Sequence, residues 1–138
     1  MKRCYMGARA AMEDALRPHG LGSTQWYVLD QLAHEGPTLQ RELQRSLQVE
    51  RATLSVVVTT LVGKGLIEQL PDRSDQRQKL LRMTSSGTRL WNQLPDLSQI
   101  EKTAFAGMDA SDLATAVDVL RIATERLENR PFERKSLT

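Results

Sequence analysis

Residues 39–61, LQRELQRSLQVERATLSVVVTTL, predict two short helices in close succession at the centre of a 138-residue chain. Leucines recur four residues apart in the first half, and the second half has the i, i+3, i+4, i+7 spacing of a buried face at Leu54, Val57, Val58 and Leu61. We expect Thr38 to cap the first helix and the second to begin near Glu50. Helices joined by so tight a turn are typical of a helix-turn-helix, whose second helix can lie in a DNA major groove.

The next segment predicts a two-stranded ribbon with a charged tip. LIEQL (66–70) and QKLLRM (78–83) have the composition of strands, and they flank the charged stretch DRSDQR. Such a ribbon directly after a helix-turn-helix is typical of a wing. We expect Arg73 and Arg77 at its tip to enter the minor groove, where narrow A·T-rich DNA concentrates negative potential.

The flanking sequence predicts helices on both sides, six in all. Residues 5–17 form the first, and a second, capped by Ser23 or Thr24, ends at Gly36-Pro37. After the wing, Thr84 is placed to cap a helix that Pro95 kinks or breaks, and Asp109 or Ser111 caps the last helix. The fold class expected is therefore mainly α with a small β-wing.

Composition and charge reduce the number of function classes that fit the chain. The chain is 40% hydrophobic and 26% charged, as in a globular protein of one domain. Residues 37–90 carry nine Lys and Arg against five Asp and Glu, a net +4, whereas the remainder is net −2. A positive stretch segregated in this way is the electrostatic pattern of a surface that meets phosphate.

The same composition argues against several other classes. One cysteine excludes an intramolecular disulfide framework and fits a reducing compartment, and no stretch approaches a membrane span, so we expect a cytoplasmic protein. The sequence has no glycine-rich phosphate loop, no nucleophile and base in a defensible order and no metal cluster. We therefore expect neither an enzyme nor a cofactor or metal.

Residues 21–69 resemble the winged helix-turn-helix core of the MarR (multiple antibiotic resistance regulator) family. The resemblance continues in the motif D-x-x-D-x-R of Asp72, Asp75 and Arg77 and in the MTSSG that follows it. The likeness extends over about residues 8–128. It implies a homodimer built from the first and last two helices, which binds a pseudo-palindromic operator and usually represses transcription. By position, the helix near Glu50 is the recognition helix, Arg77 the wing arginine and Asp75 its orienting carboxylate.

The resemblance divides the chain, one MarR-type domain over 1–138, into functional parts. Residues 21–90 are the DNA-binding lobe, residues 1–20 and 91–130 are dimerisation helices, and residues 131–138 are a tail. Two long amphipathic helices in so short a chain also need more apolar surface than the chain offers, which a second copy supplies. The residues expected at that interface are Leu97, Ile100, Leu113, Val117 and Leu120.

The expected partner of the lobe is double-stranded DNA. Arg51 can bond guanine or phosphate, Ser55 is nonspecific, and Val56, where the family commonly has a basic residue, can touch a thymine methyl group. Glu50 likewise replaces the family's small polar helix cap, and Lys64 is a further candidate for phosphate contact. The complete set of expected DNA-binding residues is Arg41, Arg45, Arg51, Ala52, Ser55, Val56, Thr59, Arg73, Asp75, Arg77 and Lys79.

A small ligand is the expected signal, because ligand sensing is the commoner mode in the family. An aromatic or phenolic carboxylate could stack on aromatic side chains and pair with an arginine. The residues expected near it are Arg9, Arg17, His19, Trp26, Tyr27 and Trp91. The alternatives are a redox response through Cys4, a winged-helix module that binds a protein partner, and an architectural DNA binder without sequence preference.

Overall fold

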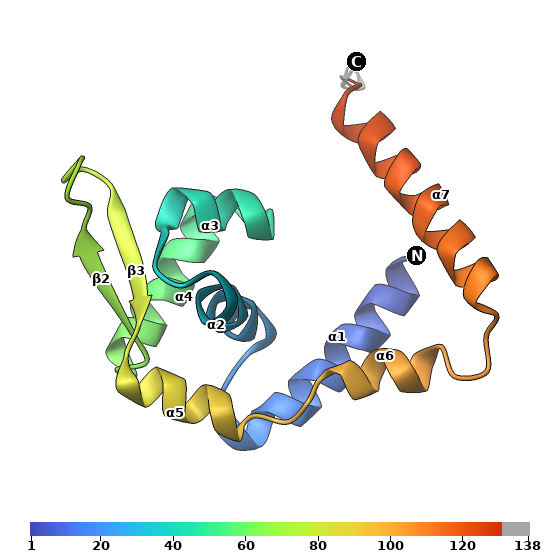
Figure 1. The fold of residues 1–138 in the computed structure, drawn as a ribbon, viewed down its shortest axis with the longest axis horizontal. Coiled ribbons are helices and arrows are strands. Elements are labelled where there is room, and N and C mark those ends of the chain that lie inside the picture. Colours follow the sequence, from blue (N-terminus) through green and yellow to red (C-terminus); the bar gives the residue numbers. More distant parts are fainter. Residues whose placement is uncertain (131–138) are drawn as a thin grey trace, which may run out of the picture. The chain divides into compact units, whose positions relative to one another are not determined.

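The computed structural model describes residues 1–130, which form a mainly helical fold with one small sheet (Figure 1). The predicted fold class is confirmed, and the predicted tail at residues 131–138 lies outside the described residues. In chain order the elements are α1 (Lys2–Leu16), the 3₁₀ helix η1 (Arg17–His19), α2 (Ser23–Glu35), β1 (Thr38–Leu39), α3 (Gln40–Leu47), α4 (Arg51–Gly63), β2 (Ile67–Pro71), β3 (Lys79–Met83), α5 (Ser85–Gln93), α6 (Ser98–Ala104) and α7 (Ala110–Glu128).

The long helix expected after the wing is divided at Pro95 into α5 and α6. Leu94 has extended backbone angles, φ −70° and ψ 148°, as the steric demand of the following proline ring requires. The described residues therefore contain seven α-helices, because the break expected at Pro95 separates what the sequence presents as one helix.

The sheet has one more strand than the sequence predicted. Its order is β1-β3-β2, with both pairs antiparallel, and β2 runs against β3 from Ile67 opposite Met83 to Pro71 opposite Lys79. Thr38 pairs with Leu81 in β1, so its expected role as the cap of α3 is wrong. Its hydroxyl donates to the Gly36 carbonyl at 2.9 Å, and Leu39 occupies the N-cap position.

The caps of the other helices are set by local hydrogen bonds. Ser23 and Thr24 do not cap α2: Gly22 is the N-cap, and its N–H donates to the Gln25 side chain at 3.2 Å. Ser23 is instead buried in the first turn. The caps predicted for α5 and α7 are confirmed, because Thr84 Oγ1 accepts the Gly87 N–H at 3.0 Å and Asp109 Oδ1 accepts the Ser111 N–H at 2.7 Å.

Two compact units make up the chain, residues 1–100 and a second unit that begins at Glu101. Every buried hydrophobic side chain of the described residues lies in the first unit, between Met12 and Leu81. Helices α2, α3 and α4 and strands β2 and β3 each contribute to this core, through residues such as Leu29, Leu43, Leu54, Ile67 and Leu81. No helix in the described residues is long and apolar enough to span a membrane.

Gly87 lets the first turn of α5 pack directly on the sheet. A Cβ atom at this position would overlap the Leu66 carbonyl oxygen and lie 2.7 Å from Met83 Cγ. Thr84 holds the same junction, since its N–H donates to the Leu66 carbonyl and its hydroxyl to the Gly65 carbonyl. The sequence MTSSG therefore fixes where the wing ends and α5 begins.

Candidate nucleic-acid interface

The turn between α3 and α4 sets the direction in which α4 leaves the core. Gln48 has a positive φ of 53°, the left-handed conformation that ends α3, and Glu50 is the N-cap of α4. Leu54, Val58 and Leu61 are buried along one side of α4. The opposite side is exposed and carries residues that the sequence predicted for DNA binding: Ala52, Ser55, Val56 and Thr59.

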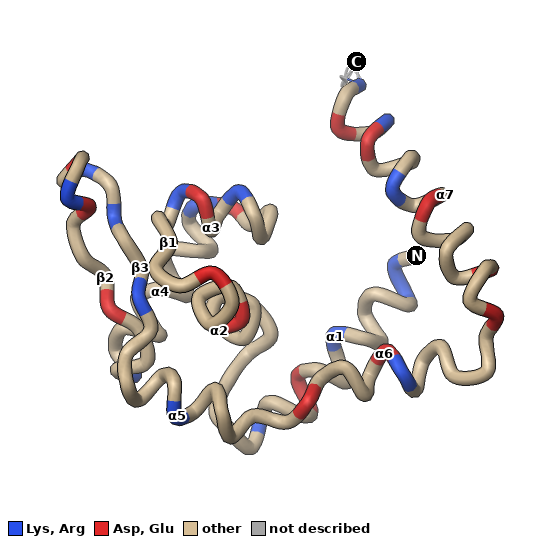
Figure 2. Tube along the Cα trace, viewed as in Figure 1, with Lys and Arg blue, Asp and Glu red and all other residues tan. Residues whose placement is uncertain are grey.

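Helices α3 and α4 present cations that are not neutralised within the described residues. Arg41 and Arg45 on α3 and Arg51 at the start of α4 are exposed, and none of their side chains has a hydrogen bond or ion pair with another described residue. Figure 2 shows basic positions along α3 and at the tip of the β2–β3 hairpin. Guanidinium groups free in this way can bond phosphate oxygens or guanine.

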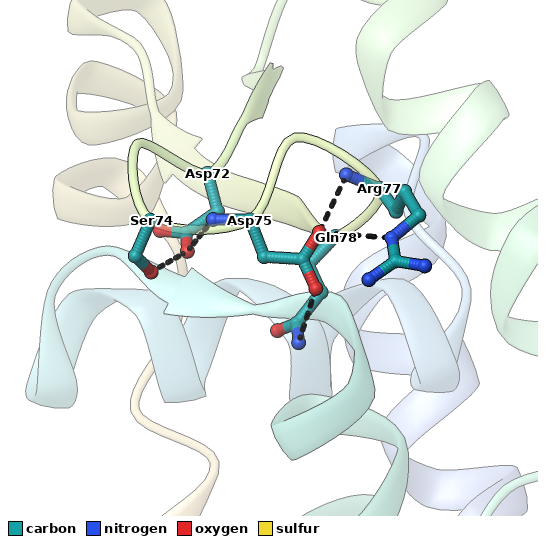
Figure 3. Close-up of polar contacts among 5 residues, drawn as sticks. All are labelled: Asp72, Ser74, Asp75, Arg77 and Gln78. Carbon is teal, nitrogen blue, oxygen red and sulfur yellow. Dashed lines mark hydrogen bonds and ion pairs between the residues drawn. The ribbon is translucent and has the colours of Figure 1, made fainter.

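The wing tip is organised around Asp75 (Figure 3). Asp75 Oδ1 accepts the Arg77 backbone N–H at 3.1 Å and Nε at 3.3 Å, and its Oδ2 accepts the Gln78 side-chain amide at 3.4 Å. The Arg77 side chain is 93% exposed, so the contact through Nε leaves the two terminal nitrogens toward solvent. The geometry fits the role of an orienting carboxylate that the family resemblance implies for Asp75.

Asp72 closes the other side of the same loop. Its Oδ2 accepts the Ser74 hydroxyl at 2.5 Å and the Asp75 N–H at 3.3 Å. The Ser74 hydrogen bond, supported by backbone N–H groups, holds the pKa of Asp72 below its ordinary value. Arg73, between the two, is exposed, and its side chain has no hydrogen bond or ion pair among residues 1–130.

A long-range hydrogen bond ties the wing to the helix-turn-helix. Gln69 Nε2 on β2 donates to Gln40 Oε1, at the first residue of α3, over 2.7 Å. Along the ribbon, Arg82 pairs with Glu68 across the strands, whereas the side chain of Lys79 is exposed and has no hydrogen bond or ion pair within the described part of the chain. Neither glutamine was identified from the sequence, because the pairing joins segments that carry no shared motif.

Lys64 is used by the fold in a way that the sequence did not indicate. Its Nζ donates to the Gly20 carbonyl at 2.5 Å and to Gln25 Oε1 at 3.2 Å. The amine thus joins the end of α4 to the turn before α2, although the side chain is still exposed.

Three of the residues predicted to bind a ligand come together between α2 and α5. The rings of Trp26 and Trp91 lie 5.6 Å apart, and Tyr27 meets Trp26 edge-on at 5.2 Å. His34, which was not predicted, stands edge-on to Trp91 at 6.2 Å, and its Nδ1 lies 3.1 Å from Asp30 Oδ1. We call Trp26, Tyr27, His34 and Trp91 the aromatic cluster.

The arginines predicted to pair with the ligand are engaged elsewhere. Arg9 pairs with Glu13 at 3.1 Å, which raises the pKa of Arg9, and Arg17 pairs with Asp14 at 2.8 Å. His19 is half-buried in η1, and Cys4 is exposed in the first turn of α1. Within residues 1–130, no hydrogen bond or ion pair connects Arg9, Arg17 or His19 with the aromatic cluster.

The residues predicted for dimerisation fall into two groups. Leu97 and Ile100 are half-buried and pack against the core of the first unit. In the second unit Leu113 is half-buried, but Val117 is 64% and Leu120 is 46% exposed. Exposed apolar side chains accompany them at Phe105, Met108, Val119, Ile122 and Leu127.

The sequence is similar to known transcriptional regulators. The MarR family model matches residues 19–78, from η1 to the wing tip. Over 130 residues the chain is 26% identical to the HTH-type transcriptional repressor NicR of Pseudomonas putida, and the match covers 94% of this chain and 82% of NicR. Residues 19–78 are thus similar to the MarR family, and the similarity to NicR extends over most of the chain.

Two solved structures of DNA-binding proteins have the same fold. A mutant form of MarR from Escherichia coli, in complex with operator DNA, superposes with a TM-score of 0.78 at 23% identity, over 86% of each chain. BpsR of Bordetella bronchiseptica, whose DNA binding is regulated by 6-hydroxynicotinic acid, superposes with a TM-score of 0.77 at 22% identity, over 89% of this chain and 94% of BpsR. The chain thus shares the winged helix-turn-helix fold of these proteins.

Proposed function

We propose that this protein is a cytoplasmic, homodimeric repressor of the MarR family that binds a pseudo-palindromic operator and is released by a small aromatic ligand. The observation that carries the proposal is the set of exposed cations on three adjacent parts of one unit, α3, the start of α4 and the wing. The side chains of five of them have no hydrogen bond or ion pair among the described residues: Arg41, Arg45, Arg51, Arg73 and Lys79. Elsewhere Arg9, Arg17 and Arg121 are paired with carboxylates, while Lys2, Arg3, Lys102 and Arg126 are exposed and unpaired within residues 1–130 but are not gathered on adjacent elements of one lobe.

DNA recognition would combine the two grooves. Helix α4 enters the major groove by its N-terminal half, while Arg41 and Arg45 contact the flanking phosphates. Arg77, held by Asp75, enters the adjacent minor groove. The operator-bound MarR structure supports this arrangement by its common fold. Because several phosphates are neutralised at once, the affinity falls steeply with salt concentration.

The dimer would be formed through the exposed apolar side chains of the second unit. Leu113, Leu120 and Leu127 recur every seventh residue of α7, and Ala116 and Ala123 lie between them. This is the a/d spacing of a helix that packs on another helix. A second copy buries the apolar surface of the second unit and sets two recognition helices about one turn of DNA apart.

The ligand would bind beside the aromatic cluster and shift the population of dimers away from the spacing that fits the operator. BpsR, which responds to an aromatic acid, supports this class of ligand. Trp26 and Trp91 are the only two tryptophans of the chain, so the fluorescence of the protein reports directly on the cluster. Titration with 6-hydroxynicotinic acid and benzoate as probes should quench it at concentrations that release DNA. Oxidation at Cys4 is the alternative signal, and a Cys4→Ser variant separates the two.

Capture of genomic DNA fragments by the full chain at moderate salt, followed by sequencing, tests the proposal. We expect a pseudo-palindrome with half-sites about 10 base pairs apart. The control is an Arg51→Glu, Arg77→Glu variant that is folded by circular dichroism and captures nothing. Enrichment without a motif would overturn the proposal in favour of an architectural DNA binder. No enrichment would overturn it in favour of a protein partner.

A further inference from the structure

The exposed side of α4 is unusually poor in groups that donate hydrogen bonds. Ala52, Ser55, Val56 and Thr59 occupy i, i+3, i+4 and i+7, on the side opposite the buried Leu54, Val58 and Leu61. We call these four residues the reading face. Arg51 at the helix start is the one charged residue within α4.

Two hydroxyl hydrogens nearby are already used within the helix, whereas the hydroxyl of Thr53, outside the reading face, has no hydrogen bond to another described residue. Thr59 Oγ1 donates to the Ser55 carbonyl at 2.8 Å, and Thr60 Oγ1 donates to the Val56 carbonyl at 3.0 Å. A base acceptor would have to displace these bonds to be read by either threonine. Ser55 is left as the single hydroxyl of the reading face without a hydrogen bond to another described residue.

Val56 is the most prominent apolar group of the reading face, with 67% of its surface exposed. A valine in a helix is held almost entirely in one χ1 rotamer, so its two methyl groups are fixed before DNA arrives. The buried side of α4 anchors the backbone that carries them, because Leu54 and Val58 are each 1% exposed. The methyl groups therefore make a rigid surface that loses little conformational entropy on contact.

The major groove offers one apolar feature to such a surface. Guanine is read best by Arg or Lys, and adenine by Asn or Gln, whereas thymine alone presents a C5-methyl group. The reading face has no Arg, Lys, Asn or Gln. We propose that Val56 is a specificity-determining residue that reads thymine C5-methyl groups in each half-site. This inference rests on the proposed function.

Replacement of thymine by deoxyuridine removes the methyl group and leaves base pairing and the O4 acceptor unchanged. Each thymine of a captured half-site is replaced in turn, and the Kd is measured by fluorescence anisotropy for the full chain. For the wild type, we expect the Kd to rise about threefold to tenfold at one or two positions, as the loss of one buried methyl group requires. Val56→Ala should bind the thymine and uracil duplexes equally at those positions.

Val62→Ala is the matched control, because it makes the same change at an exposed valine in the last turn of α4. It should keep the wild-type discrimination between thymine and uracil. Equal binding of both duplexes by the wild type at every position would overturn the inference while leaving the proposed function intact. Unchanged discrimination in Val56→Ala would also overturn it. Failure of the wild type to bind the thymine operator at all would instead contradict the proposed function.

Discussion

The two units of the chain differ in how they place their apolar side chains: the first buries them, and the second leaves them exposed. Within the first unit, strands and helices close around leucines and valines that are almost completely buried. From Glu101 to residue 130 not one side chain is buried, although α7 is rich in Val, Leu and Ile. Exposed apolar surface of this extent marks a site of association. The first unit, which carries the predicted DNA-binding residues, therefore has a core of its own, whereas the apolar side chains of α7 stay exposed, as the proposed dimer requires.

The largest expected effect is the loss of a core leucine. Leu54→Ala should lower the free energy of unfolding by about 2–5 kcal/mol, because the cavity left beneath α4 cannot collapse fully. Urea denaturation at two protein concentrations measures it, and the loss should be the same at both. Leu127→Ala is the matched change on α7. It should lower the free energy of unfolding by less than Leu54→Ala does, and only at the protein concentration where the chain is dimeric. Equal losses for the two variants at both concentrations would break the contrast between the units.

The next effect concerns self-association. Leu120→Asp places a charge in the apolar surface of α7 and should raise the dissociation constant of the dimer at least about 100-fold, measured by analytical ultracentrifugation. Thr115→Asp adds the same charge to the opposite side of α7 and should leave the dimer intact. If both variants remain dimeric, the interface lies elsewhere.

A smaller effect is expected at the wing. Arg77→Ala should weaken operator binding by about 1–3 kcal/mol, because the guanidinium held by Asp75 leaves the minor groove. Lys102→Ala, which removes a cation from α6, should not change the affinity. Unchanged affinity of a folded Arg77→Ala protein would remove this side chain from the DNA interface.

The smallest effect is a dependence of the wing on pH. Since folding lowers the pKa of Asp72, its contribution to stability is present above the ordinary aspartate pKa of about 3.9 and is lost as pH falls through the lower, folded value. The amide chemical shift of Asp75 should report this transition below about pH 3.9. Asp72→Asn should abolish it, and a wild-type midpoint above that value would contradict the hydrogen bonding seen at Ser74.

The sequence could predict the elements that depend on neighbouring residues, but not those that depend on residues remote in the chain. The helices follow from apolar periodicity and the wing signature from local residues, so α4, β2, β3 and the caps Thr84 and Asp109 were all found. Strand β1 was missed because two residues show no pattern, and its partner Leu81 is remote in the chain.

Within the candidate site, contacts between residues close in the sequence could be predicted, whereas long-range contacts could not. Asp75 and Arg77 are two residues apart, so their pairing was accessible from a motif. The hydrogen bonds from Gln69 to Gln40 and from Lys64 to Gly20 depend on how distant segments pack. The sequence alone also does not show which arginines form ion pairs with nearby carboxylates. Arg9 and Arg17 were therefore predicted to bind a ligand, although each is paired with a carboxylate of α1.

The mass of the protein–operator complex is the sharpest test of the proposed dimer on DNA. Mass photometry or sedimentation with a duplex that carries one captured operator gives the number of 15.6-kDa chains bound. We expect two chains per duplex for the wild type, and a much weaker complex with one chain for Leu120→Asp. A single wild-type chain bound at full affinity would contradict the claim that α7 pairs two DNA-reading units.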